Sequence, residues 1–297
     1  MDTKLKIGFI GYTDITNSYL RAFEKLEDSV SFEGLFLGSN EAAPEDYDGR
    51  IYTSAPELFN AVDAVVFFGE KIRKKLISDA IRSLKHIFID DYSAILNNDI
   101  DGLYNLVTEA EVTAQVSMPK MYYWSIPELM EEYKGIRYLQ FIKEQTHLHN
   151  HTEADYIPEL AAIIKVANED VLRTHYYGVP LLNKKVELVD IRLEFANGVS
   201  AGVNVNPCGF YDAQELRIIS EKAITMLDLR KREWYSLRKN ANKDIEKEVD
   251  NMEEFPFIEQ TELEDFISSI ISKKEPVVSF RHIRQVKRCL TLMEESR

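Results

Sequence analysis

The stretch IGFIGYTDIT, residues 7 to 16, decides how the chain begins to fold. An apolar run ends at Gly11, and the residues after it have the polar character of a helix start. In a dinucleotide-binding fold this turn reads G-x-G-x-x-G, because the glycines make the tight turn, admit a pyrophosphate and let helix and strand pack closely. Here Gly11, Thr13 and Thr16 occupy those positions, so the first glycine alone is kept.

Two interpretations of this turn remain open. A helix start offers free amides and positive potential to an anion, and Gly11 and Thr13 would then contact a phosphate. Alternatively, Asp14 caps the helix itself and accepts a hydrogen bond from the amide of Thr16 or Asn17. The cap would satisfy the same amides that a ligand needs.

A second signal of a dinucleotide site is an acid at the end of the second strand, where it binds the ribose hydroxyls. The segment LFLGSN, residues 35 to 40, has Ser39 and Asn40 at that point. These side chains either hydrogen-bond a 2′-phosphate or belong to a plain turn. With Gly69, after a later apolar strand, they complete the candidate cofactor-binding set.

The hydrophobic pattern changes near residue 120. Before it, short apolar runs such as AVDAVVFFG, residues 61 to 69, alternate with amphipathic stretches. This order predicts an α/β fold with a doubly wound parallel sheet, a Rossmann domain over residues 1–120. After it, period-two alternation predicts a second α+β domain, residues 121–297, with a large, mainly antiparallel sheet. Its expected strands are 135–147, 171–177, 186–196, 199–206, 215–219 and 223–229.

Three further features of the second half are predicted. Asn197-Gly198 between two strands indicates a type I′ hairpin. Helices near 155–167, 259–273 and 281–295 are expected to cover one face of the antiparallel sheet, which leaves the other face for a second subunit. The run 239–254 is charged and has no period, so we expect a solvated loop there.

Composition excludes several classes of partner. The chain has 297 residues, with 50 acidic against 36 basic side chains and a formal charge of -14, which repels nucleic acid and anionic membranes. Cys208 and Cys289 match no disulfide framework or zinc ribbon, which favours a reducing cytoplasm. No apolar run approaches the roughly 20 residues of a membrane helix, and no signal peptide is indicated.

The order of these segments resembles one family, that of glucose-fructose oxidoreductase, inositol dehydrogenase and the rhizopine-catabolism proteins (Gfo/Idh/MocA). The similar stretches are YTSAPELFNAVDAVVFF, KHIFIDDYSA, VTAQVSMPKMYY, VDIRLEFANGVSAGVNV, ELRIISEKAITMLDL and ELEDFISSIISKKEPVVSFRHIRQVKRCLTLMEES. The resemblance covers nearly the whole chain. It implies a Rossmann domain that uses NAD or NADP, a sheet domain that mediates dimerisation, and hydride exchange with a sugar or cyclitol hydroxyl.

The catalytic positions of this family hold other residues here. Its E-K-P motif falls on Asp90, Asp91 and Tyr92, so an aspartate replaces the lysine. The family's T-P-x-x-x-H falls on Gly69, Glu70 and Lys74, and its H-x-x-D falls on Pro158 and Ala161. The resemblance leaves two candidate catalytic residues, Asp91 as a base and Lys120 as the positive charge at the domain junction. Alternatively, Lys120 is a surface lysine that follows Pro119.

The sequence also contains a cluster of three histidines. HLHNH places His147, His149 and His151 at alternate positions, which in an extended segment puts them on one face, about 6.5 to 7 Å apart. Two of them can share a metal ion, with Glu153 or Asp155 as an oxygen ligand. Alternatively, the histidines are solvated or hydrogen-bond a polar ligand in the cleft.

Three hypotheses of function follow. The first is an NAD(P)-dependent oxidoreductase acting on a sugar-like substrate. The second is a noncatalytic relative that keeps the two-domain scaffold to bind a metabolite or a protein, because several chemical positions have changed while the scaffold features remain. The third is metal-dependent chemistry at His147, His149 and His151.

Overall fold

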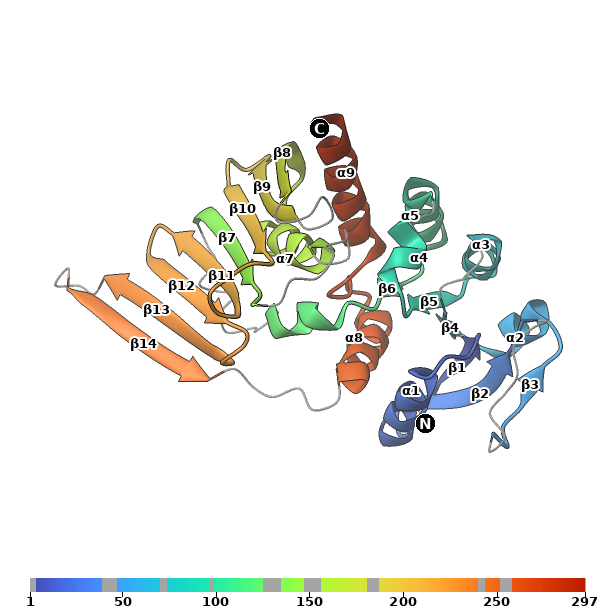
Figure 1. Ribbon diagram of the computed structural model, residues 1–297. Coiled ribbons are helices and arrows are strands. Elements are labelled where there is room, and N and C mark those ends of the chain that lie inside the picture. The colour runs from blue at the N-terminus through green and yellow to red at the C-terminus, as the bar shows by residue number, and fades with distance from the viewer. Residues whose placement is uncertain are drawn as a thin grey trace. The chain divides into compact units, whose positions relative to one another are not determined.

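A computed structural model describes residues 4–38, 47–69, 74–96, 99–124, 135–146, 156–180, 187–239, 244–251 and 258–296 (Figure 1). The chain divides into two compact units. The first comprises Met1–Tyr122 with Phe255–Arg284, and the second comprises Tyr123–Glu254 with Gln285–Arg297.

The first unit contains a six-stranded parallel sheet in the order β3-β2-β1-β4-β5-β6. Its strands are β1 (Leu5–Ile10), β2 (Val30–Phe36), β3 (Ile51–Tyr52), β4 (Ala64–Phe67), β5 (His86–Ile89) and β6 (Ala114–Val116). Its helices are α1 (Thr16–Lys25), α2 (Ala55–Ala61), α3 (Lys74–Arg82), α4 (Tyr92–Leu96), α5 (Ile100–Ala110) and α8 (Ile258–Ser272), and a 3₁₀ helix, η1 (Pro119–Trp124), follows β6. The predicted Rossmann sheet is confirmed.

Local sequence explains several of these boundaries. The Ser54 side chain accepts a hydrogen bond from the Glu57 amide, and a proline lies in the first turn, so α2 begins as a capped helix. The Asp99 side chain accepts from the Gly102 amide at the start of α5. Every residue of β4 is buried, as expected of a central strand covered on both faces.

Helix α8 packs in the first unit, which corrects the prediction that it covers the antiparallel sheet. Its Leu263, Phe266 and Ile267 belong to the same apolar core as the buried residues of β1 and α1. The rings of Phe266 and Phe88, which lies in β5, are 5.7 Å apart between centroids. An amphipathic pattern shows that a helix has an apolar face, but it does not show which sheet that face covers.

The second unit contains a mixed, mainly antiparallel sheet of eight strands in the order β14-β13-β12-β11-β7-β10-β9-β8. The strands are β7 (Ile136–Glu144), β8 (Val171–Pro180), β9 (Glu187–Phe195), β10 (Ser200–Asn206), β11 (Ala213–Ser220), β12 (Ala223–Asp228), β13 (Glu233–Lys239) and β14 (Ile245–Asn251). Helix α7 (Ile157–Ala167) contacts β7 and β10, and α9 (Phe280–Ser296) has most of its length in this unit. The predicted fold class is therefore confirmed.

Two predictions for this unit need correction. The run 239–254 is not wholly a loop, because β14 pairs with β13 along the edge of the sheet. All of β14 is exposed, and an exposed edge strand does not need the apolar side chains that reveal a buried strand.

The hairpin at Asn197-Gly198 is present, but its turn is not type I′. Gly198 has φ 81°, whereas Asn197 has no positive φ, and a type I′ turn needs both. The Gly198 amide donates to the Phe195 carbonyl, and the Phe195 amide donates to the Val199 carbonyl. This is a three-residue loop with glycine in the left-handed position.

The described residues also bear on two expectations drawn from composition, those about membrane helices and about cysteines. Within those ranges, no helix is long and apolar enough to cross a membrane. Cys208 is exposed, Cys289 is buried, and both are free thiols, as the absence of a disulfide framework predicts. Burial raises the pKa of the Cys289 thiol to about 12, so this cysteine is an inert core residue.

Candidate functional site

The candidate site is the region at the carboxyl ends of β1 and β4, where the strand order of the first sheet reverses and where sheets of this kind bind ligands in a crevice; we call this region the crevice. Gly11 follows β1 with φ 84°, and Gly69 lies two residues beyond β4 with φ 97°. The Gly11 amide donates to the Phe36 carbonyl over 2.9 Å, which holds the turn against the end of β2. Both glycines adopt a backbone conformation that other residues rarely adopt.

The turn after Gly11 is closed by hydrogen bonds within itself. The Thr13 amide donates to Thr16 Oγ1 over 2.9 Å, and the Thr16 amide donates to the Thr13 carbonyl over 3.0 Å. The expected cap by Asp14 is wrong: Ile15 is the N-cap residue of α1 and makes no side-chain cap bond. Asp14 is exposed, and the buried Thr16 side chain accepts from the Thr13 amide, which precedes the helix, so it closes the turn and does not cap α1.

The Thr13 side chain lies between the two loops of the crevice. Its Cγ2 methyl is 3.5 Å from the position that a Cβ on Gly69 would occupy. Its Oγ1 is buried and has no hydrogen-bond partner among the described residues. The methyl group therefore spans the gap between the β1 turn and the β4 loop, at the position where a glycine would leave room for a phosphate.

Asp90 is a site residue that the sequence analysis did not select. It follows β5, and its two carboxylate oxygens are 3.2 and 3.3 Å from the Gly69 amide that donates to them. Burial raises the pKa of the Asp90 carboxyl to about 7, the Gly69 hydrogen bond lowers it, and the charge of Asp91 raises it further. Near neutral pH this group can donate as well as accept a hydrogen bond. The signal for it was an acid directly after the buried strand HIFI.

Asp91, the candidate base, is engaged at the start of α4. Its Oδ1 accepts from the Ser93 amide over 2.8 Å, and its Oδ2 accepts from Ser93 Oγ over 2.6 Å. These are the bonds of a helix-capping aspartate. They satisfy one acceptor site on each oxygen and fix the orientation of the side chain at the family's lysine position.

The residues of the crevice do not fit a dinucleotide seated as in a G-x-G-x-x-G turn. Two amides of the turn are already bonded, the Thr13 methyl occupies the gap, and Thr13 Oγ1 is buried. The loops of β1 and β5 also carry Asp14, Asp90 and Asp91, and carboxylates repel a pyrophosphate. We therefore derive no chemistry through NAD or NADP.

Lys120, the second candidate catalytic residue, is exposed on η1 after β6. Carboxyl ends of parallel strands share one edge of a sheet, so Lys120 follows the edge that carries the crevice. Two acids of α8, the buried Glu262 and the partly buried Asp265, hold the segment around it: the Met118 amide donates to Glu262, and Tyr122 Oη donates to Asp265. A role for Lys120 stays a prediction.

In the second unit, the positions of the family's H-x-x-D motif are buried. Pro158 and Ala161 both lie in α7 and face the core. Between them Glu159, 1% exposed, forms an ion pair with Lys143 of β7 over 3.3 Å. This part of α7 therefore makes a structural contact with the sheet through the ion pair. It lacks the histidine and aspartate of the family's motif.

Several candidate residues lie outside the described residues: Ser39, Asn40, Glu70, His147, His149, His151, Glu153 and Asp155. Within the described ranges, no group of three or more histidine, cysteine, aspartate or glutamate side chains is placed to hold a metal ion. Metal binding by the histidine cluster stays a prediction.

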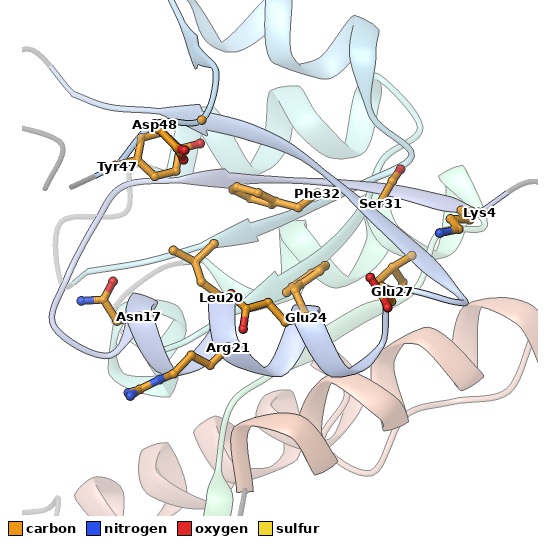
Figure 2. Close-up of a pocket in the computed structure, with 13 residues that line it drawn as sticks. Lys4, Asn17, Leu20, Arg21, Glu24, Glu27, Ser31, Phe32, Tyr47 and Asp48 are labelled. Atoms are coloured by element: carbon orange, nitrogen blue, oxygen red, sulfur yellow. The ribbon is translucent and has the colours of Figure 1, made fainter.

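A separate cavity of about 760 Å³ lies beside α1 and β2 (Figure 2). Leu20 from α1 and Phe32 from β2 form part of its wall, and Tyr47 and Asp48 border it on the other side. Its charged residues are mixed in sign: Lys4, Arg21, Glu24, Glu27 and Asp48. The cavity therefore has no strong preference for ligand charge.

Comparison with solved structures finds the same fold along the whole chain. UDP-N-acetylglucosamine 3-dehydrogenase from Acidithiobacillus ferrooxidans superposes with a TM-score of 0.80 at 16% identity, covering 99% of this chain and 97% of its own. The dehydrogenase MviM from Clostridium difficile gives 0.77 at 18% identity, covering 99% and 100%. An NAD binding oxidoreductase from Klebsiella pneumoniae gives 0.76 at 14% identity, covering 99% and 97%.

These likenesses show the fold. The neighbours are named as dehydrogenases and an NAD binding oxidoreductase, so the fold that the sequence resemblance implies is confirmed. No protein-family model matches the chain, and no curated protein matches it. A scaffold can persist while the residues that perform the reaction change, so the function depends on the residues of the crevice and not on the fold.

Proposed function

We propose that this chain is a noncatalytic relative of these dehydrogenases that binds a small, sugar-like ligand at the carboxyl edge of its first sheet. The observation that carries this proposal is the state of Asp91. It stands where the family has its catalytic lysine, and it caps α4 through Ser93. A carboxylate cannot supply the positive charge that stabilises the developing alkoxide in a hydride transfer.

The crevice favours a neutral ligand with several hydroxyl groups. Asp90 accepts hydrogen bonds when ionised and donates one when protonated, and near neutral pH both forms are present. Hydroxyl groups are both donors and acceptors, so a polyol can bind either form. An anionic ligand would be repelled by Asp14, Asp90 and Asp91.

Titration calorimetry with N-acetylglucosamine and myo-inositol tests this proposal. We expect measurable binding of one of them by the wild-type chain, and at least about tenfold weaker binding by Asp90→Ala, which removes a hydrogen-bonding carboxyl. The matched control is Asp79→Ala, because Asp79 is an acid of α3, outside the crevice, with a loose contact to Arg82. Equal affinities of wild type and Asp90→Ala would contradict the assignment.

The second candidate function is an NAD(P)-dependent oxidoreductase acting on a sugar or cyclitol. It is favoured by fold neighbours that cover nearly the whole chain and include an NAD binding oxidoreductase. Oxidation of NADH or NADPH in the presence of keto-sugars distinguishes the two. No turnover is expected from the noncatalytic chain, and a steady rate that survives in several independent preparations would establish the oxidoreductase.

We further propose that the chain forms a homodimer through the outward face of the second sheet. Ile219, Ile224 and Leu237 are cross-strand neighbours on β11, β12 and β13, and they are 36%, 48% and 41% exposed. In the next row of cross-strand neighbours, Tyr235 of β13 pairs with Val249 of β14, which is 50% exposed. An exposed apolar surface across four strands supports association with a second copy.

A further inference from the structure

The crevice contains a specific barrier to one class of ligand. A dinucleotide lies across the point where the strand order reverses, with its pyrophosphate over the turn after the first strand. In this chain that turn faces Gly69 across the Thr13 methyl group. The backbone of Gly11 has kept the left-handed conformation that such a turn requires, so the frame of the phosphate site remains.

Thr16 closes the same turn from the helix side. Its Oγ1 accepts from the Thr13 amide, and its own amide donates to the Thr13 carbonyl. Thr16 is completely buried, so no phosphate oxygen can replace its hydroxyl without rearrangement of the turn. In a glycine-rich turn before a helix the backbone amides bind the phosphate, and here the Thr13 amide of that turn already donates to a side chain.

We propose that Thr13 and Thr16 together determine the ligand class of this crevice by excluding dinucleotides. Thr13 fills the space that a phosphate would enter, and Thr16 occupies an amide that would bind it. This inference rests on the proposed function, because it explains why a crevice on a dehydrogenase scaffold accepts a small neutral ligand. It also assigns the exclusion to two side chains, while the backbone of the phosphate site stays intact.

The steric and hydrogen-bonding parts of the exclusion are separable. Replacing Thr13 by glycine removes the methyl group from the gap opposite Gly69. Replacing Thr16 by alanine frees the Thr13 amide and keeps a residue that favours a helix. Thr13→Val keeps the shape of the side chain and the bond from its amide to Thr16, so the turn stays closed.

The test measures NADH binding to the full chain by calorimetry, with circular dichroism to establish that each variant is folded. We expect very weak binding by the wild-type chain and by Thr13→Val. The double variant Thr13→Gly/Thr16→Ala is expected to bind NADH at least about tenfold more tightly. Inorganic pyrophosphate, added as a competitor, should displace NADH from the double variant.

Two results would overturn the inference. The first is NADH binding by the wild-type chain that is as tight as binding by the double variant, because the turn would then not be closed. The second is a folded double variant that binds no more tightly than Thr13→Val. Neither result decides the proposed function, which depends on the sugar titration and on the absence of NAD(P)H turnover.

Discussion

Glu262 is a buried acid whose partners, as far as the described residues show them, are hydrogen-bond donors. Its carboxylate accepts from Tyr19 Oη at 2.8 Å, from Ser117 Oγ at 2.9 Å and from the Met118 amide at 2.9 Å. Burial raises the pKa of Glu262 to about 7, although these hydrogen bonds lower it. The penalty of burying the charge is therefore larger than the gain from the donors.

The pH dependence of stability follows from this raised pKa. The folded state holds the Glu262 proton more tightly than the unfolded state, so this contribution is complete below about pH 4.5 and is lost as the pH rises through about 7. In the wild type, the free energy of unfolding should therefore fall by up to about 1.4 kcal/mol per pH unit between about pH 4.5 and pH 7. Glu262→Gln has no carboxyl group at this position, so it should not show this fall. Urea unfolding at several pH values measures the free energy of unfolding of both proteins. The same pH dependence in the wild type and in Glu262→Gln would refute the prediction.

Asp91 gives a second prediction for a single residue. Asp91→Ala removes both hydrogen bonds to Ser93 and should lower the free energy of unfolding by about 1 kcal/mol, as the loss of a helix cap does. Asp91→Asn keeps an acceptor for the Ser93 amide and should cost less. Thermal and urea unfolding of both variants provide the comparison. An unchanged stability of Asp91→Ala would show that the cap is unimportant.

The contact between α7 and β7 depends on one buried ion pair. Lys143 and Glu159 are 9% and 1% exposed, and Gln214 also donates to Glu159. Lys143→Met removes the cation of this ion pair and leaves the Glu159 carboxylate in the core, so it should lower the free energy of unfolding by about 3–5 kcal/mol. The double variant Lys143→Met/Glu159→Met should recover part of this loss. A double-mutant cycle by urea unfolding measures the coupling, and additive losses would contradict it.

The elements themselves were predicted where burial imposes a period on the sequence. Apart from the two-residue β3, which was not predicted, the strands of the first sheet follow from apolar runs, and helices α2 and α5 follow from amphipathic stretches. Strands β13 and β14 were not predicted. In β14 the apolar residues Ile245 and Val249 are exposed and separated by charged side chains, so the pattern does not show a buried face. Helix α8 was found, but its packing partner in the first sheet depends on contacts between residues far apart in the sequence, such as Phe88 and Phe266.

On the scale of the whole molecule, the proposed dimer depends on the apolar rows of β11 to β14. Leu237→Glu introduces a charge into the row that contains Ile219 and Ile224, and desolvating that charge on association is costly. We expect the variant to be monomeric at micromolar concentration, where the wild type is a dimer. Analytical ultracentrifugation measures the mass of each species.

Leu172→Glu is the matched control for this prediction. Leu172 is an exposed apolar residue, 53% exposed, on β8 at the opposite edge of the same sheet. It lies outside the rows of β11 to β14, so its substitution should leave the dimer intact. A monomeric wild type, or a dimer that tolerates Leu237→Glu, would remove the proposed interface.

The sequence by itself determined the fold class and the changes at the catalytic positions, because hydrophobic periodicity and residue identity are local properties of the chain. It identified Asp91 and Thr13 as replacements but could not say what they do. The tertiary structure decided that Asp91 caps α4, that Asp90 contacts the Gly69 amide, and that Thr13 lies against Gly69. Those roles depend on which loops meet at the edge of the sheet, and long-range packing brings these loops together.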